Sequence, residues 1–260
     1  MTWNNILVTK EENIAILTIN RPKVLNALNY ETVTEIGRAM EQLEADPEVR
    51  VIIVTGAGDR AFVAGADIVY MSGLTSLQAR DFARQGQLVL NKIENLAKPV
   101  IAAINGFALG GGCELAMACD IRVAAQSAKL GQPEVNLGIM AGFGGTQRLT
   151  RLVNSGWAKE ILFTADQYDA QTACKIGLVN HVVPAEQLLD FCRDLAKRIA
   201  RRGPVAVRLT KEAVNEGLEM DLDKALAHEA DLFGVLFSTE DRKEGIAAFI
   251  EKRKPEFKNC

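Results

Sequence analysis

The apolar positions along the chain change period several times, and each change predicts a secondary-structure element. Two short β-branched runs, Asn13 to Ile19 and Arg50 to Thr55, have the length and composition of strands. Between them, the apolar residues of segment 31–44 recur at helical spacing among charged ones, which predicts an amphipathic helix. The order strand, helix, strand is the first indication of an α/β protein.

The same alternation continues through the middle of the chain. Apolar residues at helical spacing from Phe82 to Ile93 predict a helix, and the runs Pro99 to Ile104 and Ile121 to Ala124 predict buried strands. Leu178 to Val183 is the last strand that the pattern predicts. An α/β architecture follows for this part of the chain.

Beyond residue 184 the pattern changes to helices alone. The predicted helices cover residues 185–202, 204–217, 222–236 and 239–253. Pro204 suits the first position of the second helix, and Ser238 to Asp241 fits a capping box that opens the last one. Because apolar helix faces must be buried, we expect packing against the core or against other copies of the chain.

Composition and charge narrow the functional classes. The 260 residues are 48% hydrophobic and 24% charged, with a formal net charge of −3, which supplies no general attraction for nucleic acid or anionic membranes. No apolar run approaches the roughly 18 to 20 residues of a membrane-spanning helix, and the N-terminus lacks the pattern of a signal peptide. We therefore expect a cytoplasmic protein with no nucleic-acid or membrane partner.

The cysteines and histidines give no metal or disulfide pattern. Two histidines, His181 and His228, occur without a recognisable ligand spacing, so no protein-bound catalytic metal is expected. The five cysteines are scattered and odd in number, and we interpret them as reduced. They are Cys113, Cys119, Cys174, Cys192 and Cys260.

The most informative stretch is a glycine-rich centre between Ile101 and Asp120. A buried strand passes through Gly110, Gly111 and Gly112 into a helix of small residues. Glycines at a helix start expose uncrowded N–H groups that can hold an anion or a developing oxyanion, and Gly111 is the candidate donor. The alternative is that these glycines only permit close packing; their spacing does not fit a dinucleotide-binding turn.

Two glutamates near this stretch are candidate acid/base groups. Glu114 lies just inside the apolar helix, where burial would raise the pKa of its carboxyl group. Glu134 lies in Gly131 to Gly138, where it follows Pro133 as at an ordinary helix start. From the residues alone, the commoner explanation for each is a structural glutamate favoured by the helix dipole at a helix start, and their spacing does not show that they meet.

Five motifs agree in order and spacing with a known family. They are Asn20 to Leu28, Ala61 to Ile68, Asn105 to Asp120, Gly131 to Gly138 and Gly142 to Leu149. Through them the chain resembles the enoyl-CoA hydratase, or crotonase, family over essentially its whole length. The resemblance implies an α/β crotonase (ClpP-like) spiral of ββα repeats with a C-terminal helical trimerisation region. It implies a core at residues 1–195, an oligomerisation region at 196–260, and trimers that pair into hexamers.

The same resemblance implies a reaction on coenzyme A thioesters. By motif position, the backbone N–H groups of Ala66 and Gly111 form an oxyanion hole around the thioester oxygen. Hydratases of the family carry glutamates at the positions of Glu114 and Glu134 and hold one water between them. We assign Glu114 mainly to activating the water and Glu134 mainly to proton transfer at the α-carbon. No cofactor is expected, because coenzyme A is part of the substrate.

Further substrate contacts follow from the motifs. Lys23, Val24 and Leu25 match a segment that contacts coenzyme A, while Phe249 and Lys252 match positions that reach the nucleotide of a neighbouring subunit. The remaining substrate-binding positions are Ala64, Asp67, Ile68 and Gly142. The sequence departs from the family at two places, with Val69 where lysine is frequent and Ala141 where proline is frequent.

The acyl substrate is less readable. Segment 78–95 is where relatives vary, and Tyr70 and Met71 are candidates to line a short pocket. Similarity is greatest to bacterial short-chain members, which interconvert crotonyl-CoA and 3-hydroxybutyryl-CoA in fatty acid and butyrate or butanol metabolism.

Two other functions stay open at this point. The first is a crotonase-fold isomerase that uses one glutamate as base. The second is an RNA-binding homologue, for which a basic stretch across two predicted helices is the relevant feature; we interpret it as solvated helix faces. Its residues are Arg198, Arg201, Arg202, Arg208 and Lys211.

Overall fold

The computed structural model describes residues 3–259, so Cys260 lies outside the described part of the chain. Its larger sheet has six strands in the order β1-β2-β3-β5-β7-β10. All neighbours in it are parallel except β1 and β2, which form an antiparallel hairpin. The strands are β1 (Ile6–Glu11), β2 (Ile14–Ile19), β3 (Val51–Gly56), β5 (Val100–Ile104), β7 (Ile121–Ala125) and β10 (His181–Val183).

A smaller sheet runs beside the first, in the order β4-β6-β8-β9. Its strands are β4 (Ala61–Val63), β6 (Phe107–Leu109), β8 (Lys129–Gly131) and β9 (Tyr168–Asp169). Along the chain, β3, β5 and β7 in the large sheet are each followed by a strand of the small one and then by helices. The repeating unit is therefore two strands and a helical segment, which advances by one position in each sheet.

Helices cover both faces of the large sheet. Side chains alternate along each strand, so in β3 Ile52 and Val54 point to one apolar core while Val51 and Ile53 point to another. Helices α1 (Tyr30–Ala45) and α3 (Ser76–Asn95) close the first core, and α8 (Leu188–Ala200) closes the second. Strands buried on both faces explain why these runs are almost purely apolar.

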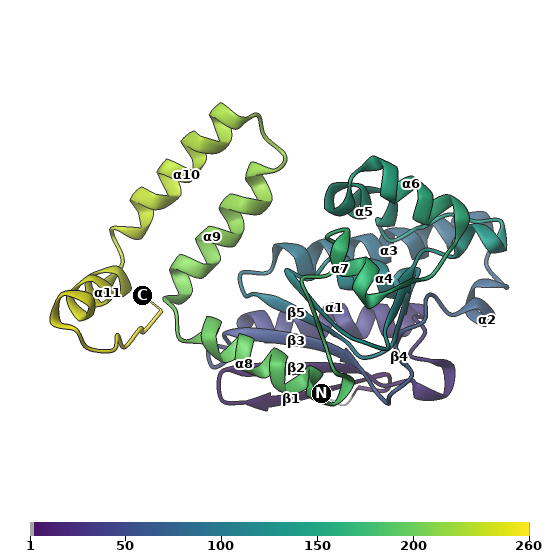
Figure 1. Cartoon of the computed structure of the whole chain (residues 1–260), viewed down its shortest axis with the longest axis horizontal. Coiled ribbons are helices and arrows are strands. Elements are labelled where there is room, and N and C mark those ends of the chain that lie inside the picture. Colours follow the sequence, from purple (N-terminus) through teal and green to yellow (C-terminus); the bar gives the residue numbers. More distant parts are fainter. Residues whose placement is uncertain (1–2, 260) are drawn as a thin grey trace.

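The C-terminal helices stand apart from the sheets (Figure 1). They are α9 (Pro204–Gly217), α10 (Leu222–Leu236) and α11 (Glu240–Glu251). A partly buried ion pair connects α9 to the core, because Lys211 Nζ donates to Asp120 Oδ2 at 2.9 Å. Among residues 3–259, no helix combines the length and apolar character needed to span a bilayer.

The remaining helices are short. They are α2 (Ile68–Met71), α4 (Gly111–Met117), α5 (Gly145–Val153), α6 (Ser155–Thr164) and α7 (Ala170–Lys175). Three single-turn 3-10 helices complete the chain: η1 (Pro22–Val24), η2 (Glu134–Leu137) and η3 (Ala185–Gln187).

Most predicted elements are confirmed within one or two residues, and the differences have physical causes. The hairpin strand β1 was not predicted because most of its residues are exposed, so it lacks the continuous apolar run that marks the buried strands. The predicted strand at 178–183 is shorter, because Leu178 and Val179 bond back to Ala173 in a turn. Pro204 does occupy the first turn of α9.

The predicted capping box at Ser238 is wrong. Thr239 caps α11, since its hydroxyl accepts from the N–H of Arg242. Asp241 is instead buried, and its carboxylate accepts the N–H groups of Lys258 and Asn259 in the C-terminal tail. A carboxylate engaged by the tail is not available to return a hydrogen bond to the helix start.

One close approach fixes the geometry where the two sheets meet α4. A Cβ added to Gly112 would lie 1.9 Å from the carbonyl oxygen of Val63 in β4. Only glycine permits this backbone-to-backbone packing. It holds the start of α4 against the segment that follows β4.

We predict that Gly112→Ala destabilises the protein by about 3 kcal/mol or more, because the obstacle is backbone and cannot rotate away. Gly217→Ala is the matched control, since its added Cβ would make ordinary contact with Ala225 at 3.6 Å. Urea unfolding of both variants measures the difference. Equal stability of the two would contradict the close approach.

Candidate active site

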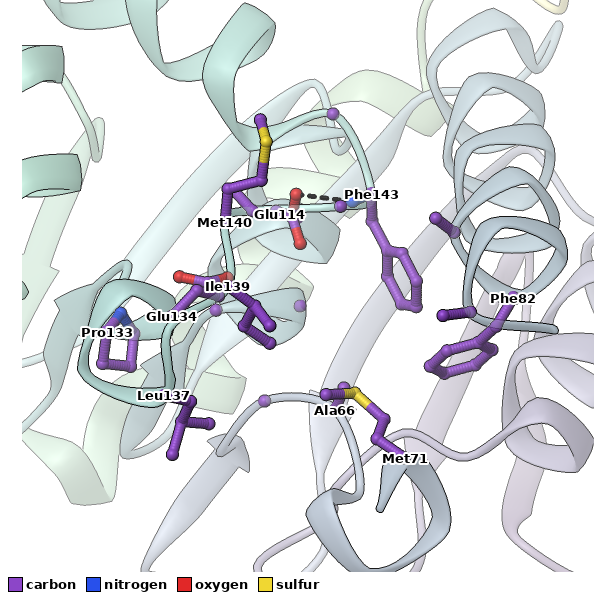
Figure 2. A pocket seen from close by; sticks show the side chains of 18 of the residues that line it. Ala66, Met71, Phe82, Glu114, Pro133, Glu134, Leu137, Ile139, Met140 and Phe143 are labelled. Atoms are coloured by element: carbon purple, nitrogen blue, oxygen red, sulfur yellow. Dashed lines mark hydrogen bonds between the residues drawn. The ribbon is translucent and has the colours of Figure 1, made fainter. Parts of the chain in front are cut away.

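A cavity of about 920 Å³ lies between helix α3 and the segments that follow strands β4, β6 and β8. Four stretches line it, 64–74, 79–87, 110–114 and 133–147, and most of the lining side chains are apolar. Figure 2 shows two carboxylates on one side, Glu114 and Glu134, facing the aromatic rings of Phe82 and Phe143 on the other. Such an apolar cavity with a few convergent polar groups is typical of a small-molecule site.

Glu114 is almost completely enclosed, at 2% exposure, on the inner face of α4. Its Oε1 accepts two backbone hydrogen bonds, from the N–H of Phe143 at 2.8 Å and that of Gly145 at 2.6 Å. Burial raises the pKa of this carboxyl to about 7; repulsion from Glu134 adds to the shift, while the two N–H groups oppose it. The group is therefore poised to exchange a proton near neutral pH.

Glu134 opens the single turn η2 directly after Pro133, as the sequence predicts for a helix start. Burial raises the pKa of its carboxyl as well. The hydrogen-bond partners of the buried Gln132 assign its amide the orientation in which the nitrogen faces Glu134. In this orientation the nitrogen donates to Oε1 at 2.8 Å and to Oε2 at 3.1 Å. This holds the carboxylate at the cavity wall, on the same side as Glu114 (Figure 2).

Two residues that line the cavity, Ala66 and Gly111, have backbone N–H groups without an internal acceptor in the described part of the chain. Within residues 3–259, neither Ala66 nor Gly111 donates its N–H to another group of the chain. A Cβ built on Gly111 would lie 3.6 Å from the Ala66 nitrogen, so the two segments are in contact. A pair of unpaired amides at a cavity wall is a suitable receptor for a carbonyl oxygen that gains negative charge.

The structure brings several other predicted residues to the cavity. Ala64, Ile68 and Gly142 line it. Asp67 has a different local task, since it caps α2 through the N–H of Tyr70 and pairs with Arg21 at 2.9 Å. It fixes the segment that carries Ala66 and is not among the lining residues.

Other predicted contacts lie beyond the cavity. Lys23 and Val24 are exposed, and Leu25 connects to the cavity wall because its carbonyl accepts the N–H of Ala64 at 3.0 Å. Phe249, 85% exposed, and Lys252 lie on the projecting α11, which a single chain does not bring to the cavity (Figure 1).

The two departures from the family pattern differ in their setting. Val69 is 85% exposed, so it leaves the surface of α2 without a positive charge. Ala141 is buried in the cavity wall, and its neighbour Gly142 accepts a hydrogen bond from Gln87 at 2.9 Å. The turn that follows is thus fixed without proline.

Several site residues were missed by the sequence analysis. Phe143 and Gly145 hold Glu114 through backbone N–H groups, which leave no trace in a residue pattern. Gln132 and Arg148 are polar groups in otherwise apolar surroundings, and both lie within the motifs already noted. A buried polar residue next to a candidate carboxylate was the one available signal.

The described lining residues include no histidine or cysteine, so they offer a metal only the two carboxylates. A separate group on the α9–α10 hairpin brings ligand-type atoms of Glu212, Glu216 and His228 within 4.8 Å of one another. Its members are partly exposed, and His228 Nε2 already lies 3.2 Å from Glu216 Oε2. We assign no metal to the candidate site.

Known proteins are similar to this chain over nearly its whole length. The family described as enoyl-CoA hydratase/isomerase matches residues 9–260. A crotonyl-CoA hydratase of Syntrophomonas wolfei is 56% identical, with 99% of each chain covered. A short-chain-enoyl-CoA hydratase of Clostridium acetobutylicum is 53% identical, with 100% of each covered. The crystal structure of an enoyl-CoA hydratase from Bacillus anthracis has a TM-score of 0.96 at 42% identity, covering 99% of this chain and 100% of that one.

The raised pKa of Glu114 predicts a pH-dependent cost in stability. The folded protein keeps a proton that the unfolded chain loses between about pH 4.5 and 7, so stability falls as pH rises through that window. Glu114→Gln removes this cost, which is about 3 kcal/mol. We therefore expect the free energy of unfolding of the variant to exceed that of the wild type at pH 8 but not at pH 4.5.

Urea unfolding at the two pH values and fixed protein concentration measures this effect. Glu186→Gln, on an exposed glutamate, is the matched control and should show no such dependence. A stability difference between Glu114→Gln and wild type that is the same at both pH values would contradict the shift.

Proposed function

Because the chain belongs to the enoyl-CoA hydratase/isomerase family, and has its crotonase fold, we propose that it reversibly hydrates short-chain trans-2-enoyl-CoA. The proposed substrate is crotonyl-CoA and the product 3-hydroxybutyryl-CoA, as the names of two relatives more than half identical suggest. The observation that carries the proposal is the pair of partly or fully buried glutamates opposite two unpaired amides in one cavity.

The amides of Ala66 and Gly111 would receive the thioester oxygen. Hydrogen bonds to this oxygen draw electron density from the conjugated double bond, so the β-carbon becomes electrophilic. They also stabilise the enolate that forms when water adds. The donors are fixed parts of the backbone, so they need no reorganisation during the reaction.

The two carboxyl groups would handle the water and its protons. With one water between them, Glu114 accepts a proton as the water oxygen bonds to the β-carbon, and Glu134 delivers a proton to the α-carbon. The pair carries one proton before and after the step, and the substrate gains the elements of water. The two N–H donors limit the rise of the Glu114 pKa to about 7, so part of this group is ionised at neutral pH and can act as the base.

No cofactor is required by this chemistry, because every atom added comes from water and the carboxyl groups. The two sites interact, so they titrate as a pair and the rate should depend on their joint state. Activity requires one shared proton and is therefore expected to fall at both low and high pH.

The alternative functions have less support. A double-bond isomerase needs one carboxylate as base, which leaves the enclosed Glu114 and its two N–H donors without a role. For RNA binding, the basic stretch is smaller than the sequence suggests, because Lys211 is enclosed and paired with Asp120.

We also propose a homo-oligomer, a hexamer built from two trimers. Helices α9 to α11 belong to the C-terminal region at 196–260 that we assign to oligomerisation, as distinct from the core at 1–195. They expose several large apolar side chains in the single chain: Leu218, Leu222, Phe233, Phe249 and Ile250. In such an assembly Phe249 and Lys252 would reach the coenzyme A nucleotide of a neighbour.

The contacts with coenzyme A and the cell compartment complete the proposal. Lys23, Val24 and Leu25 would contact coenzyme A at the cavity entrance, to which Leu25 is joined by its hydrogen bond with Ala64. A cytoplasmic location fits the free cysteines of the described chain.

Hydration is tested by incubating the protein with crotonyl-CoA and following the loss of absorbance of the conjugated thioester. Glu114→Gln and Glu134→Gln should each lower kcat by about 100- to 10,000-fold, with little change in KM, because proton transfer is lost while binding remains. Glu186→Gln serves again as the control. Near-normal turnover in either site variant would remove that residue from the proposed pair.

The oligomer is tested by sedimentation. Wild type is expected at six times the mass of the chain, and Leu222→Asp with Phe233→Asp should shift it to smaller species, because charges would enter the proposed apolar interface. A wild-type monomer would contradict the assembly.

A further inference from the structure

Polar side chains connect helix α3 to segment 142–145, whose backbone N–H groups bind Glu114. Gln87 Nε2 donates to the carbonyl of Gly142 at 2.9 Å. Arg148 Nη1 donates to the carbonyl of Phe143 at 3.1 Å, and the same guanidinium binds Glu94 of α3 through Nε at 3.0 Å and Nη2 at 2.6 Å. Segment 142–145 therefore moves with α3.

A third attachment is apolar and depends on a single glycine. A Cβ added to Gly86, in the middle of α3, would lie 2.2 Å from Cδ1 of Phe143 and 2.5 Å from Cε1. The ring thus lies directly against the helix backbone, in space that any other side chain would occupy. It also meets Phe82 edge to face, with centroids 5.1 Å apart.

The ring of Phe143 is part of the cavity wall beside the proposed reaction centre. Its Cδ2 and Cε2 atoms would lie 3.5 Å from a Cβ built on Gly111. Figure 2 shows Phe143 and Phe82 across the cavity from Glu114 and Glu134. An acyl chain whose carbonyl oxygen meets the Ala66 and Gly111 amides would run along this aromatic wall.

Phe143 therefore serves the site twice. Its ring limits the room for the acyl chain, and its backbone N–H donates to the Glu114 carboxylate at 2.8 Å. Because one residue does both, a displacement of Phe143 that carries its backbone along with the ring would also disturb the hydrogen bond that orients Glu114.

We propose that Gly86 is a specificity-determining and positioning residue, which seats the Phe143 ring and thereby sets both the acyl length admitted and the orientation of Glu114. It acts through Phe143 and touches no reacting atom. The inference rests on the proposed hydration of enoyl-CoA and adds the feature that restricts the acyl group to short chains.

Two substitutions should change the specificity in opposite directions. In Gly86→Ala the new methyl group pushes the ring off α3 into the cavity, so kcat/KM for an eight-carbon enoyl-CoA should fall at least tenfold more than for crotonyl-CoA. In Phe143→Leu the cavity becomes wider at this wall while the backbone N–H stays in place. The ratio of kcat/KM for the eight-carbon enoyl-CoA to kcat/KM for crotonyl-CoA should therefore rise about tenfold.

A second readout separates positioning from a general structural defect. Gly86→Ala should also lower kcat for crotonyl-CoA and displace its pH profile, because the N–H of Phe143 moves away from Glu114. The double variant Gly86→Ala/Phe143→Leu removes the clash and should recover kcat to the level of Phe143→Leu. Gly156→Ala is the control, since this exposed glycine does not line the cavity and an added Cβ there would make ordinary contact with Asn154 Oδ1 at 3.4 Å.

The experiment measures kcat/KM of all variants for four-, six- and eight-carbon enoyl-CoA, and calorimetric binding of butyryl-CoA and octanoyl-CoA. Binding reports the acyl room even where turnover is lost. Unchanged chain-length ratios in both single variants, or a double variant no better than Gly86→Ala, would overturn the inference. A wild type that binds these thioesters but hydrates none would count against the proposed function, while the binding ratios would still test the acyl wall.

Discussion

The site depends on a carboxyl group that is kept out of water. Glu114 is enclosed by α4 and by segment 143–145, and its burial alone would strongly disfavour the charged form. Two backbone N–H groups on one oxygen offset part of that cost, which leaves the pKa near neutrality instead of far above it. Burial of this carboxyl lowers the stability of the folded protein at neutral and higher pH. The same burial brings the pKa to a value at which the group can both take and give a proton.

Glycine packing makes this arrangement possible at two places. Gly112 lets α4 lie against the backbone of β4, which brings the Gly111 amide beside that of Ala66. On the far side, Gly86 lets the Phe143 ring lie on α3. The sheets and α3 are thus connected to the segments that carry the site by close packing at glycine. Side-chain hydrogen bonds from Gln87 and Arg148 complete the connection to α3.

The sequence was most informative where elements are long. Long helices such as α1 and α3 carry a helical period and the buried strands of five or six residues form continuous apolar runs, whereas β4, β6 and β8, with three residues each, give neither signal. The helices α5, α6 and α7, of six to ten residues, were not predicted either. The burial of Glu114 could be predicted from its apolar helix. Its position near Glu134 could not be predicted from the residues alone, because the two glutamates belong to different elements. Only the family resemblance indicated that they lie together. The N–H groups of Phe143 and Gly145 were unpredictable, since every residue but proline has one.

The central claim is that Glu114 exchanges its proton near neutral pH. The most direct measurement follows the carboxyl stretch of protonated Glu114 by infrared difference spectroscopy, with Glu114→Gln identifying the band, as pH is raised from about 4 to about 9. The band should disappear with a midpoint near pH 7, as burial against two N–H donors requires. A midpoint at the ordinary glutamate value of about 4.5 would contradict the account.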